Sequence, residues 1–592
     1  MNKFKLYIGI ACSVLALSSC NDILDTTPTN ILTDPTVWVN KEAIDAYVGK
    51  MYDQMQVEDL NYYVDSEAQY PSQVTDEATR SYTWGSANNE LIPEGMFGWW
   101  GYEQVRNVNT FLSKIQTATI LTQEQCNVYE AEARFCRAMD YFAMVKRYGG
   151  VPLITEAQVY NGGNMESLRI PRSKESEVYD FIQKECEEIA AILPETRADD
   201  EKYRATRYAV YALECRAMLY AASEAKYGTV QLDGLVGISA DKANGYWQAA
   251  KAAAEKIMNS GKYALYNGQS DRAENFQYLF LDKSNDEQIF TKAFDSSNKG
   301  ETFDYYNAPQ SFKVDYGCVT NPTEDLVAEY EYIDGGEGTL KVNDAQGNPI
   351  KYDNPVDLFK DKDPRLLATV IYPFCPWQGG TVEIRKGIVK SDGSIVTASS
   401  LNDKFEGTST TIAGKDGALT SGDVTKTGFY IKKFMNSTKQ VDYGYGDTNW
   451  MVFRYGEVLL NYAEACIELG DEADALKAVN MIRERAGIAK HTSVNRDQVR
   501  HERKMELAFE NHRWWDIRRW HIADQLLNAK KFKALNPYLV WEDGKDVSQM
   551  KYIFKIEDAP KNTRTFLSKL YYERIPSSAI STNPNIVQNP GY

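Results

Sequence analysis

Apolar residues recur at helical spacing in two long stretches of the chain. The first set, in which gaps of three and four positions alternate, comprises Val128, Ala131, Phe135, Ala138, Phe142 and Val145. The second set comprises Tyr208, Tyr211, Ala212, Cys215, Met218, Leu219 and Ala222. This spacing places apolar side chains on one face of an amphipathic helix. Because short breaks with Gly or Pro separate these patterns, we predict paired helices over residues 41–262, as in a helical-repeat scaffold.

The second half of the chain changes from loop-like to helical patterns. Residues 331–428 contain 13 glycines among short alternating runs, which predicts loops, turns and short strands. Helical spacing returns over residues 450–525. There, Leu460–Ala465 resembles the first helix of a tetratricopeptide helix–turn–helix, with Gly470 as its C-cap and Asp471 as the next N-cap.

A last long helix is predicted from Arg496 to Trp520. Opposite charges lie three and four positions apart along it, at Arg503, Glu506, Glu510 and Arg513. Such spacing predicts ion pairs along one helix face, which stabilise the helix and need no catalytic role. Trp514 and Trp515 are predicted to anchor this helix on the body of the protein.

The N-terminus has the features of an export signal. Lys3 and Lys5 precede an apolar run from Leu6 to Leu17, which falls short of the ~20 residues that span a bilayer. The segment ends in Leu17-Ser18-Ser19-Cys20, which resembles a bacterial lipobox, so we predict lipid attachment at Cys20. The alternative is a secreted protein in which Cys20 has no special role. The predicted order is a signal peptide (1–19), a lipidated Cys and tether (20–40) and one domain (41–592).

The net charge and the cysteine pattern argue against several classes of protein. The chain of 592 residues has 66 Lys and Arg against 83 Asp and Glu, a formal charge of −17, which argues against a nucleic-acid-binding protein. The same charge would be repelled by anionic lipid, so contact with a membrane would depend on the lipid anchor alone. Seven cysteines follow Cys20 without any C-x-x-C, which predicts neither a disulfide framework nor a zinc site. Those in helical patterns are expected to be buried as small apolar residues.

Catalytic motifs are missing from the sequence. It contains no G-x-S-x-G, Walker A or G-x-G-x-x-G motif, and His501–Met505 only approaches H-E-x-x-H, with Met at the second ligand position. We therefore predict no catalytic residues, no metal site and no cofactor. Two alternatives stay open: a glycosidase pair among the 83 carboxylates, and calcium bound by acidic loops.

Aromatic residues in predicted loops are the better functional signal. The segment from Tyr62 to Tyr102 contains nine aromatic residues with little helical periodicity up to Pro93. Sugars present an apolar face that stacks on rings and hydroxyls that polar side chains bind. Candidate glycan-binding residues here are Trp84, Arg80, Asn88, Trp99 and Trp100, although Trp99 and Trp100 also fit packing at a helix start.

Two further aromatic groups are candidates for the same surface. Tyr305 and Tyr306, in a cluster with Phe303, Phe312 and Tyr316, are predicted to form an opposite wall, unless they belong to a buried strand. Trp377 is predicted to be exposed in a loop.

Several strings of residues stand in a fixed order along the chain, at 132–138, 147–153, 454–460, 462–465, 482–487, 502–510, 513–516 and 583–592. Together they resemble the SusD/RagB family of surface lipoproteins from Bacteroidetes. The match at 454–460 has Gly456 where the family commonly has Ala, and residues 331–428 are the weakest stretch.

The resemblance implies a mainly α, SusD-like fold, with tetratricopeptide-like helix pairs and an irregular, ligand-facing region of loops and short strands. It implies a non-catalytic, lipid-anchored protein exposed on the outer membrane. Such a protein captures oligosaccharides and delivers them to a SusC-like TonB-dependent β-barrel transporter. In the family, the region before the helix that is expected here to begin near Trp99 contributes to the glycan site. Peptide capture, as in the RagB branch, is the alternative ligand class, and a surface glycoside hydrolase is the alternative activity.

Overall fold

A computed structural model describes residues 37–62, 68–561 and 563–592. The predicted signal peptide, Cys20, most of the tether and Tyr63 lie outside the described residues. The described part is mainly helical, which confirms the predicted fold class. The helices of its first half are α3 (Lys41–Gln54), α4 (Tyr102–Ile115), α5 (Gln123–Tyr148), α6 (Met165–Leu168), α7 (Glu175–Ala190), α8 (Arg207–Tyr227) and α9 (Ala243–Met258).

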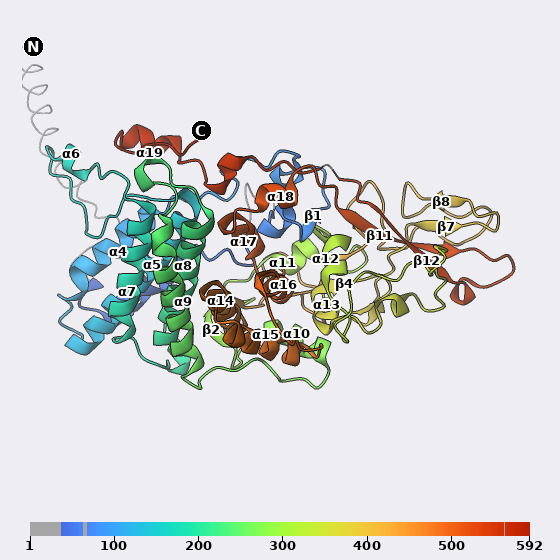
Figure 1. Ribbon diagram of the computed structural model, residues 1–592, viewed down its shortest axis with the longest axis horizontal. Coiled ribbons are helices and arrows are strands. Elements are labelled where there is room, and N and C mark those ends of the chain that lie inside the picture. The colour runs from blue at the N-terminus through green and yellow to red at the C-terminus, as the bar shows by residue number, and fades with distance from the viewer. Residues whose placement is uncertain (1–36, 63–67, 562) are drawn as a thin grey trace, which may run out of the picture.

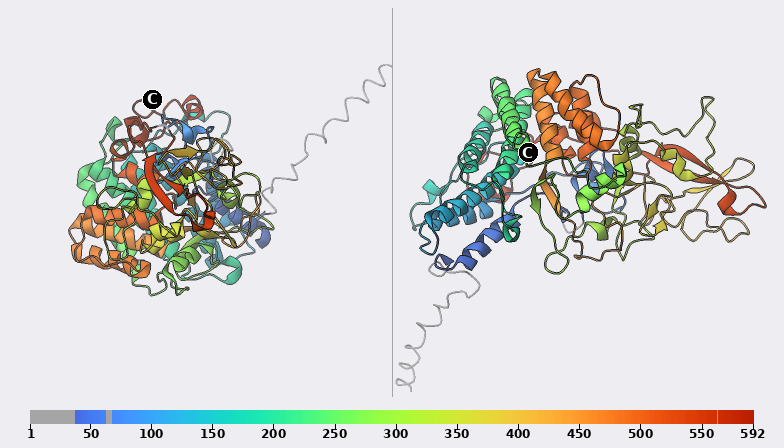
Figure 2. Two further views of the ribbon diagram at one scale, coloured as in Figure 1. Left: turned by 90° about the vertical axis from the view of Figure 1, so that its right-hand side faces the viewer. Right: turned by 90° about the horizontal axis from the view of Figure 1, so that it is seen from below.

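The long helices of the first half lie side by side (Figure 1; Figure 2, right). Each of α4, α5, α7, α8 and α9 packs on the next, and α9 continues the array onto α14 (Tyr455–Leu469). Both apolar patterns of the sequence fall on helices, in α5 and α8. Helix α8 differs from the prediction, because it is buried on nearly every side rather than on one face. Its many alanines and Cys215 allow neighbouring helices to approach it closely from all directions.

Further helices follow α9 along the chain. They are α10 (Arg272–Leu281), α11 (Phe303–Asn307), α12 (Glu324–Glu329), α13 (Pro364–Thr369), α15 (Glu472–Ala486), α16 (Arg496–Leu507), α17 (Arg513–Arg519), α18 (Ala523–Leu527) and α19 (Ser577–Thr582). The α14–α15 pair has the predicted tetratricopeptide-like form. Gly470 ends α14 in the left-handed conformation (φ 88°), and Asp471 is the N-cap of α15.

The single helix predicted from Arg496 to Trp520 is wrong. The chain forms α16 and α17 instead, and Phe509 and Asn511 between them have positive φ (64° and 60°). Contacts from distant parts of the chain hold this break open: the Phe509 N–H donates to Glu77 Oε1 (3.3 Å), and Asn511 donates to the Glu58 carbonyl. Trp514 and Trp515 are buried, as predicted for anchors of this segment.

The predicted pairs between Arg503, Glu506, Glu510 and Arg513 are also wrong, because these side chains reach other elements. Arg503 donates to Asp516 Oδ2 (2.8 Å) and Arg513 to Asp76 (2.8 Å). Burial of these charges makes partners across the core necessary, because an unpaired buried charge is costly.

Arg454 is central to the largest of these buried charge networks. Its guanidinium donates to Glu287 (2.7 Å), Glu506 (2.9 Å) and Glu510 (2.6 Å). Burial alone would raise the pKa of Glu506, but Arg485, Arg454 and neighbouring cations bring it far below its usual range. The network joins β10 (Trp450–Arg454) to the α16–α17 segment.

Strands are short and form several small sheets. They are β1 (Ala78–Arg80), β2 (Gln288–Lys292), β3 (Thr320–Pro322), β4 (Val370–Ile371), β5 (Pro376–Trp377), β6 (Gly380–Thr381), β7 (Gly387–Val389), β8 (Ile395–Thr397), β9 (Tyr430–Ile431), β10, β11 (Lys533–Val540) and β12 (Tyr552–Asp558). The largest sheet has the order β12-β11-β7-β8 and lies at the end of the molecule away from the α4–α9 array (Figure 1). The predicted loop region 331–428 supplies β7 and β8, and β7 runs parallel to β11.

Short 3₁₀ helices fill several connections. They are η1 (Pro71–Val74), η2 (Ser86–Asn88), η3 (Asp199–Glu201), η4 (Leu232–Gly234), η5 (Ala240–Lys242), η6 (Pro355–Phe359), η7 (Val547–Gln549) and η8 (Ser568–Tyr571). The seven cysteines in the described residues are free and buried, including Cys136, Cys215 and Cys466 in helices as expected.

Candidate functional site

Two small strands bring the predicted aromatic segments together. Strand β1 pairs antiparallel with β3, with Ala78 opposite Pro322 and Arg80 opposite Thr320. The Ser81 N–H continues the pairing by donating to the Val319 carbonyl (3.0 Å). The chain segments after β1 and before β3 therefore lie side by side, although more than 200 positions separate them in the sequence. The first segment carries Trp84 and the second carries Tyr305 and Tyr306.

Trp84 presents its ring on the surface of the loop at residues 81–89. It is 48% exposed and stacks on Tyr82, with ring centroids 5.1 Å apart at 26°. The Arg80 guanidinium lies 4.8 Å from the Trp84 ring centroid and donates to the Trp84 carbonyl (3.0 Å). Asn88 is half-buried, donates to the Thr83 carbonyl (2.9 Å) and accepts from Lys561 (2.7 Å).

Arg80 differs from its expected role at the rim of a sugar. It is buried, with 1% of its surface exposed, and its Nη1 donates to the Ala68 carbonyl (3.0 Å). The guanidinium is thus directed into the protein, where it holds the Trp84 loop and the ring above it. Arg80 is a positioning residue for Trp84 rather than a surface contact.

Four tyrosines form a ring cluster, here called the tyrosine cluster: Tyr305, Tyr306, Tyr316 and Tyr443. The ring centroid of Tyr305 lies 5.2 Å from Tyr306, 5.9 Å from Tyr316 and 5.4 Å from Tyr443. Tyr316 and Tyr443 are 45% and 53% exposed, whereas Tyr305 is buried beneath them. The expectation of a buried strand does not hold, because Tyr305 and Tyr306 lie on helix α11. Phe303 and Phe312 of the predicted group are buried in the core.

Tyr82 joins the Trp84 loop to the tyrosine cluster. Its hydroxyl donates to the Gly317 carbonyl (2.7 Å) and accepts from the Gly317 N–H (3.2 Å), one residue after Tyr316. Tyr82 is buried, so these bonds are shielded from water. The aromatic groups that the sequence suggested separately are thus parts of one aromatic surface.

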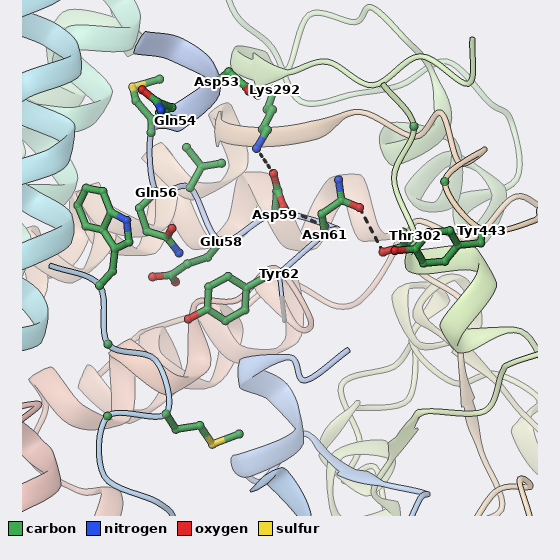
Figure 3. A pocket seen from close by; sticks show the side chains of 18 residues that line it. Asp53, Gln54, Gln56, Glu58, Asp59, Asn61, Tyr62, Lys292, Thr302 and Tyr443 are labelled. Atoms are coloured by element: carbon green, nitrogen blue, oxygen red, sulfur yellow. Dashed lines mark hydrogen bonds and ion pairs between the residues drawn. The ribbon is translucent and has the colours of Figure 1, made fainter. Parts of the chain in front are cut away.

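A cavity of about 790 Å³ adjoins this surface (Figure 3). It lies between the chain after α3, the segment around Trp99, and the loops at residues 300–302 and 443–444. Its polar and aromatic lining includes Gln54, Gln56, Asn61, Tyr62, Thr302 and Tyr443. The Thr302 hydroxyl donates to Asn61 Oδ1 (3.2 Å), which closes one side. Tyr443 therefore belongs both to the tyrosine cluster and to the wall of the cavity.

Charged groups of the cavity wall are held in ion pairs. Lys292 pairs with Asp59, whose Oδ1 also accepts from the Asn61 N–H (2.9 Å). Glu58 pairs with Arg147 and with Lys146 (3.2 Å). Burial alone would raise the pKa of Glu58, but these two cations bring it below its usual value, so Glu58 is ionised at neutral pH.

Three of the sequence candidates lie apart from the aromatic surface. Trp99 is half-buried and lines the cavity. Trp100 packs at the start of α4, with its ring centroid 5.0 Å from Tyr102 and 5.2 Å from Tyr148, so it fits the packing alternative. The exposure expected for Trp377 is wrong, because it is only 4% exposed and lies in the short β5–β6 hairpin.

Sequence reasoning missed Tyr443, Asn61 and Thr302. A sequence pattern could have identified Tyr443, because it lies in the alternating run Tyr443-Gly444-Tyr445-Gly446. Aromatic residues beside glycines in a loop are typical of binding surfaces. Asn61 and Thr302 had no such signal, since common polar residues acquire a role here only through folding.

The described residues contain no helix long and apolar enough to span a membrane. Within the same ranges, no three His, Cys, Asp or Glu side chains are grouped so as to hold a metal ion.

Comparison with known proteins gives matches over most of the chain. Residues 286–592 match the model of the SusD family, and residues 5–219 match a model described as starch-binding, associating with the outer membrane. A SusD-like protein of Formosa agariphila, P38, is 23% identical over 559 residues, which cover 89% of this chain and 94% of the relative. A SusD-like protein of Bacteroides ovatus is 24% identical, with 89% of this chain and 84% of the relative covered.

Solved structures have the same fold. A SusD-like protein from Bacteroides fragilis superposes with a TM-score of 0.70 at 26% identity, covering 95% of this chain and 99% of that one. A laminarin-binding SusD-like protein has a TM-score of 0.58 at 19% identity over 94% of this chain and all of that one, which indicates a shared fold alone.

Proposed function

This chain belongs to the SusD family of non-catalytic carbohydrate-binding proteins, and we propose that it captures oligosaccharides for a SusC-like TonB-dependent transporter. As a member of this family it is a SusD-like surface glycan-binding protein associated with the outer membrane. The proposal adds its lipid anchor, the location of its glycan site and its transporter partner.

The aromatic surface is the observation that supports the glycan site. Trp84, Tyr316 and Tyr443 are each about half exposed, and exposed rings that gather in one surface patch are typical of a binding site. Their ring faces would stack on the apolar faces of consecutive sugar units, while hydroxyl and amide groups nearby bind sugar hydroxyls. Buried contacts at Arg80 and Tyr82 hold the rings in place before a ligand arrives, which lowers the entropic cost of binding.

The anchor and the partner follow from the N-terminal sequence and the family. Cys20 is proposed to carry the lipid, which would hold an acidic protein at the membrane without a basic surface patch. The transporter is proposed because capture at the surface must be followed by passage through the outer membrane.

The test of the glycan site is affinity electrophoresis of residues 21–592 in gels that contain plant, microbial or host polysaccharides. We expect at least one polysaccharide to retard the protein, and Trp84→Ala or Tyr443→Ala to abolish most of the retardation. Tyr445→Ala is the matched control, because Tyr445 is 61% exposed in the same loop as Tyr443. Equal retardation of all variants would refute the site. Quenching of intrinsic fluorescence by peptide pools and not by glycans would instead favour the peptide alternative.

The anchor and the transporter need separate tests. Labelled fatty acid should be incorporated into the full chain and not into the Cys20→Ser variant. A β-barrel transporter should co-purify with the full chain from detergent-solubilised outer membranes. Unlabelled full chain, or purification without any such partner, would refute the respective part.

A further inference from the structure

The cavity and the tyrosine cluster are continuous through Tyr443. Thr302 at the cavity wall directly precedes α11, which carries Tyr305 and Tyr306. We infer that the two form one two-part site for an uncharged oligosaccharide: consecutive sugars stack on the tyrosine cluster, and a chain end or branch enters the cavity. This inference rests on the proposed glycan-binding function and adds to it the class of sugar and a second contact region.

The wall that joins the two parts is fixed by close backbone packing. Glu301 and Gly446 exchange backbone hydrogen bonds of 2.8 and 3.1 Å. A Cβ atom at Gly300 would lie 1.9 Å from the Gly444 carbonyl oxygen, so only glycine allows this approach. These backbone contacts therefore fix the position of Tyr443 beside the cavity.

Size and lining of the cavity suit a sugar. Its volume of about 790 Å³ is within the range of roughly 300–1,000 Å³ that is usual for small-ligand sites. Gln54, Gln56 and Asn61 supply amides, and Thr302 supplies a hydroxyl, all groups that bind sugar hydroxyls. Tyr62 and Trp99 add rings at the wall.

Charge at the cavity argues against an anionic sugar. Three carboxylates line it, and each already has a cation: Asp53 pairs with Lys299, Glu58 with Arg147 and Lys146, and Asp59 with Lys292, which is the one Lys or Arg of the lining. Lys292 is already engaged by Asp59. A uronate or sulfate group would have to displace Asp59 and would then leave a carboxylate unpaired beside a second anion, which is unfavourable at low solvent exposure. Neutral hydroxyl groups have no such cost.

Blocking the cavity with a label on an introduced cysteine tests whether the cavity takes part in glycan binding. The seven native cysteines among the described residues are buried, so Gln56→Cys in the 21–592 chain offers one accessible thiol for a bulky maleimide. The probes are laminarin, amylopectin, xyloglucan and galactomannan as neutral polysaccharides, and polygalacturonate and chondroitin sulfate as anionic ones. Met481→Cys on α15, 40% exposed and not part of the cavity lining, is the labelling control. Gln54→Cys replaces Gln56→Cys if that variant does not fold.

We expect retardation by a neutral polysaccharide, at least a tenfold loss of its association constant after labelling at Gln56→Cys, and less than a twofold loss after labelling at Met481→Cys. Retardation only by the anionic polysaccharides would overturn the inference on sugar class. Unchanged binding with the plugged cavity, but loss with Tyr443→Ala, would overturn the two-part site and leave the proposed function intact. No retardation by any probe would count against the proposed function, and the inference would fall with it.

Discussion

Tyr82→Phe is the most direct test of whether the aromatic surface is held ready for its ligand. The substitution keeps the ring that stacks on Trp84 and removes only the hydroxyl that binds both backbone groups of Gly317. A net hydrogen bond contributes about 1 kcal/mol, and a buried group left without its partner costs about 1–3 kcal/mol. Two such bonds at a buried residue therefore give a local loss of about 2 kcal/mol, which corresponds to roughly 30-fold easier opening of the loop.

Hydrogen exchange measures this opening without knowledge of the ligand. In Tyr82→Phe, peptides that contain the Gly317 amide should lose protection by roughly 30-fold. The Val319 amide, which donates to the Tyr306 carbonyl (3.0 Å), should keep most of its protection and serves as an internal control. For a polysaccharide that retards the intact protein, the affinity should fall about fivefold, less than in Trp84→Ala, because the stacking rings are still present.

Two results would refute the reasoning behind Tyr82→Phe. Unchanged exchange at Gly317 would mean that the hydroxyl does not hold the two segments together. Faster exchange with unchanged glycan affinity would mean that the joined arrangement of Trp84 and the tyrosine cluster has no part in binding.

Three further predictions concern buried groups. Burial alone would raise the pKa of Glu464, but the facing Arg519 (2.6 Å) outweighs it and brings the pKa down to about 2. The charged form of Glu464 therefore stabilises the fold by about 3 kcal/mol above pH 4.5, and this stabilisation is lost as pH falls towards 2. Thermal unfolding of Glu464→Gln should show a lower Tm at pH 7 and a flatter decline between pH 5 and 3, and a parallel decline would contradict this. Burial raises the pKa of Asp304 and of the neighbouring Glu301, so the folded state binds more protons than the unfolded state. The stability of the fold should therefore decrease as pH rises from about 4 to 7. Asp304→Asn should reduce this decrease and raise the Tm at pH 8, and a lower Tm at pH 8 would contradict the prediction. Trp377→Phe should leave polysaccharide affinity unchanged in the gel assay, because Trp377 is buried, and a clear loss would place it back in the site.

Local patterns explain which parts of the fold were predictable. Regular apolar spacing identified α5 and α8, and the Gly470–Asp471 pair marked the turn after α14, because both depend on backbone geometry and nearby residues. The break between α16 and α17 was not predictable in this way. It has no Gly or Pro, and the left-handed Phe509 and Asn511 are held by Glu77 and Glu58, which are more than 400 positions earlier in the chain.

Predictability of the site was limited in the same way. Composition identified the aromatic segments around Trp84 and Tyr305, but it gave no distance between them, because the β1–β3 pairing that joins them is a long-range contact. The sequence also did not distinguish the exposed Trp84 from the buried Trp377. A tryptophan beside glycines and prolines is compatible with a surface loop or with a buried hairpin, and only packing by the rest of the chain decides between them.

The arrangement of buried charge explains why such a surface can be rigid although it is built from loops. Asp76, just before β1, receives Arg513 (2.8 Å) and Lys504 (2.8 Å), so the start of the strand that leads to Trp84 is tied to the α16–α17 segment. The same segment binds Arg454 at the end of β10, the strand that follows the Tyr443 loop. The Trp84 loop and the Tyr443 loop are therefore both tied to the α16–α17 segment by buried ion pairs, which are costly to break.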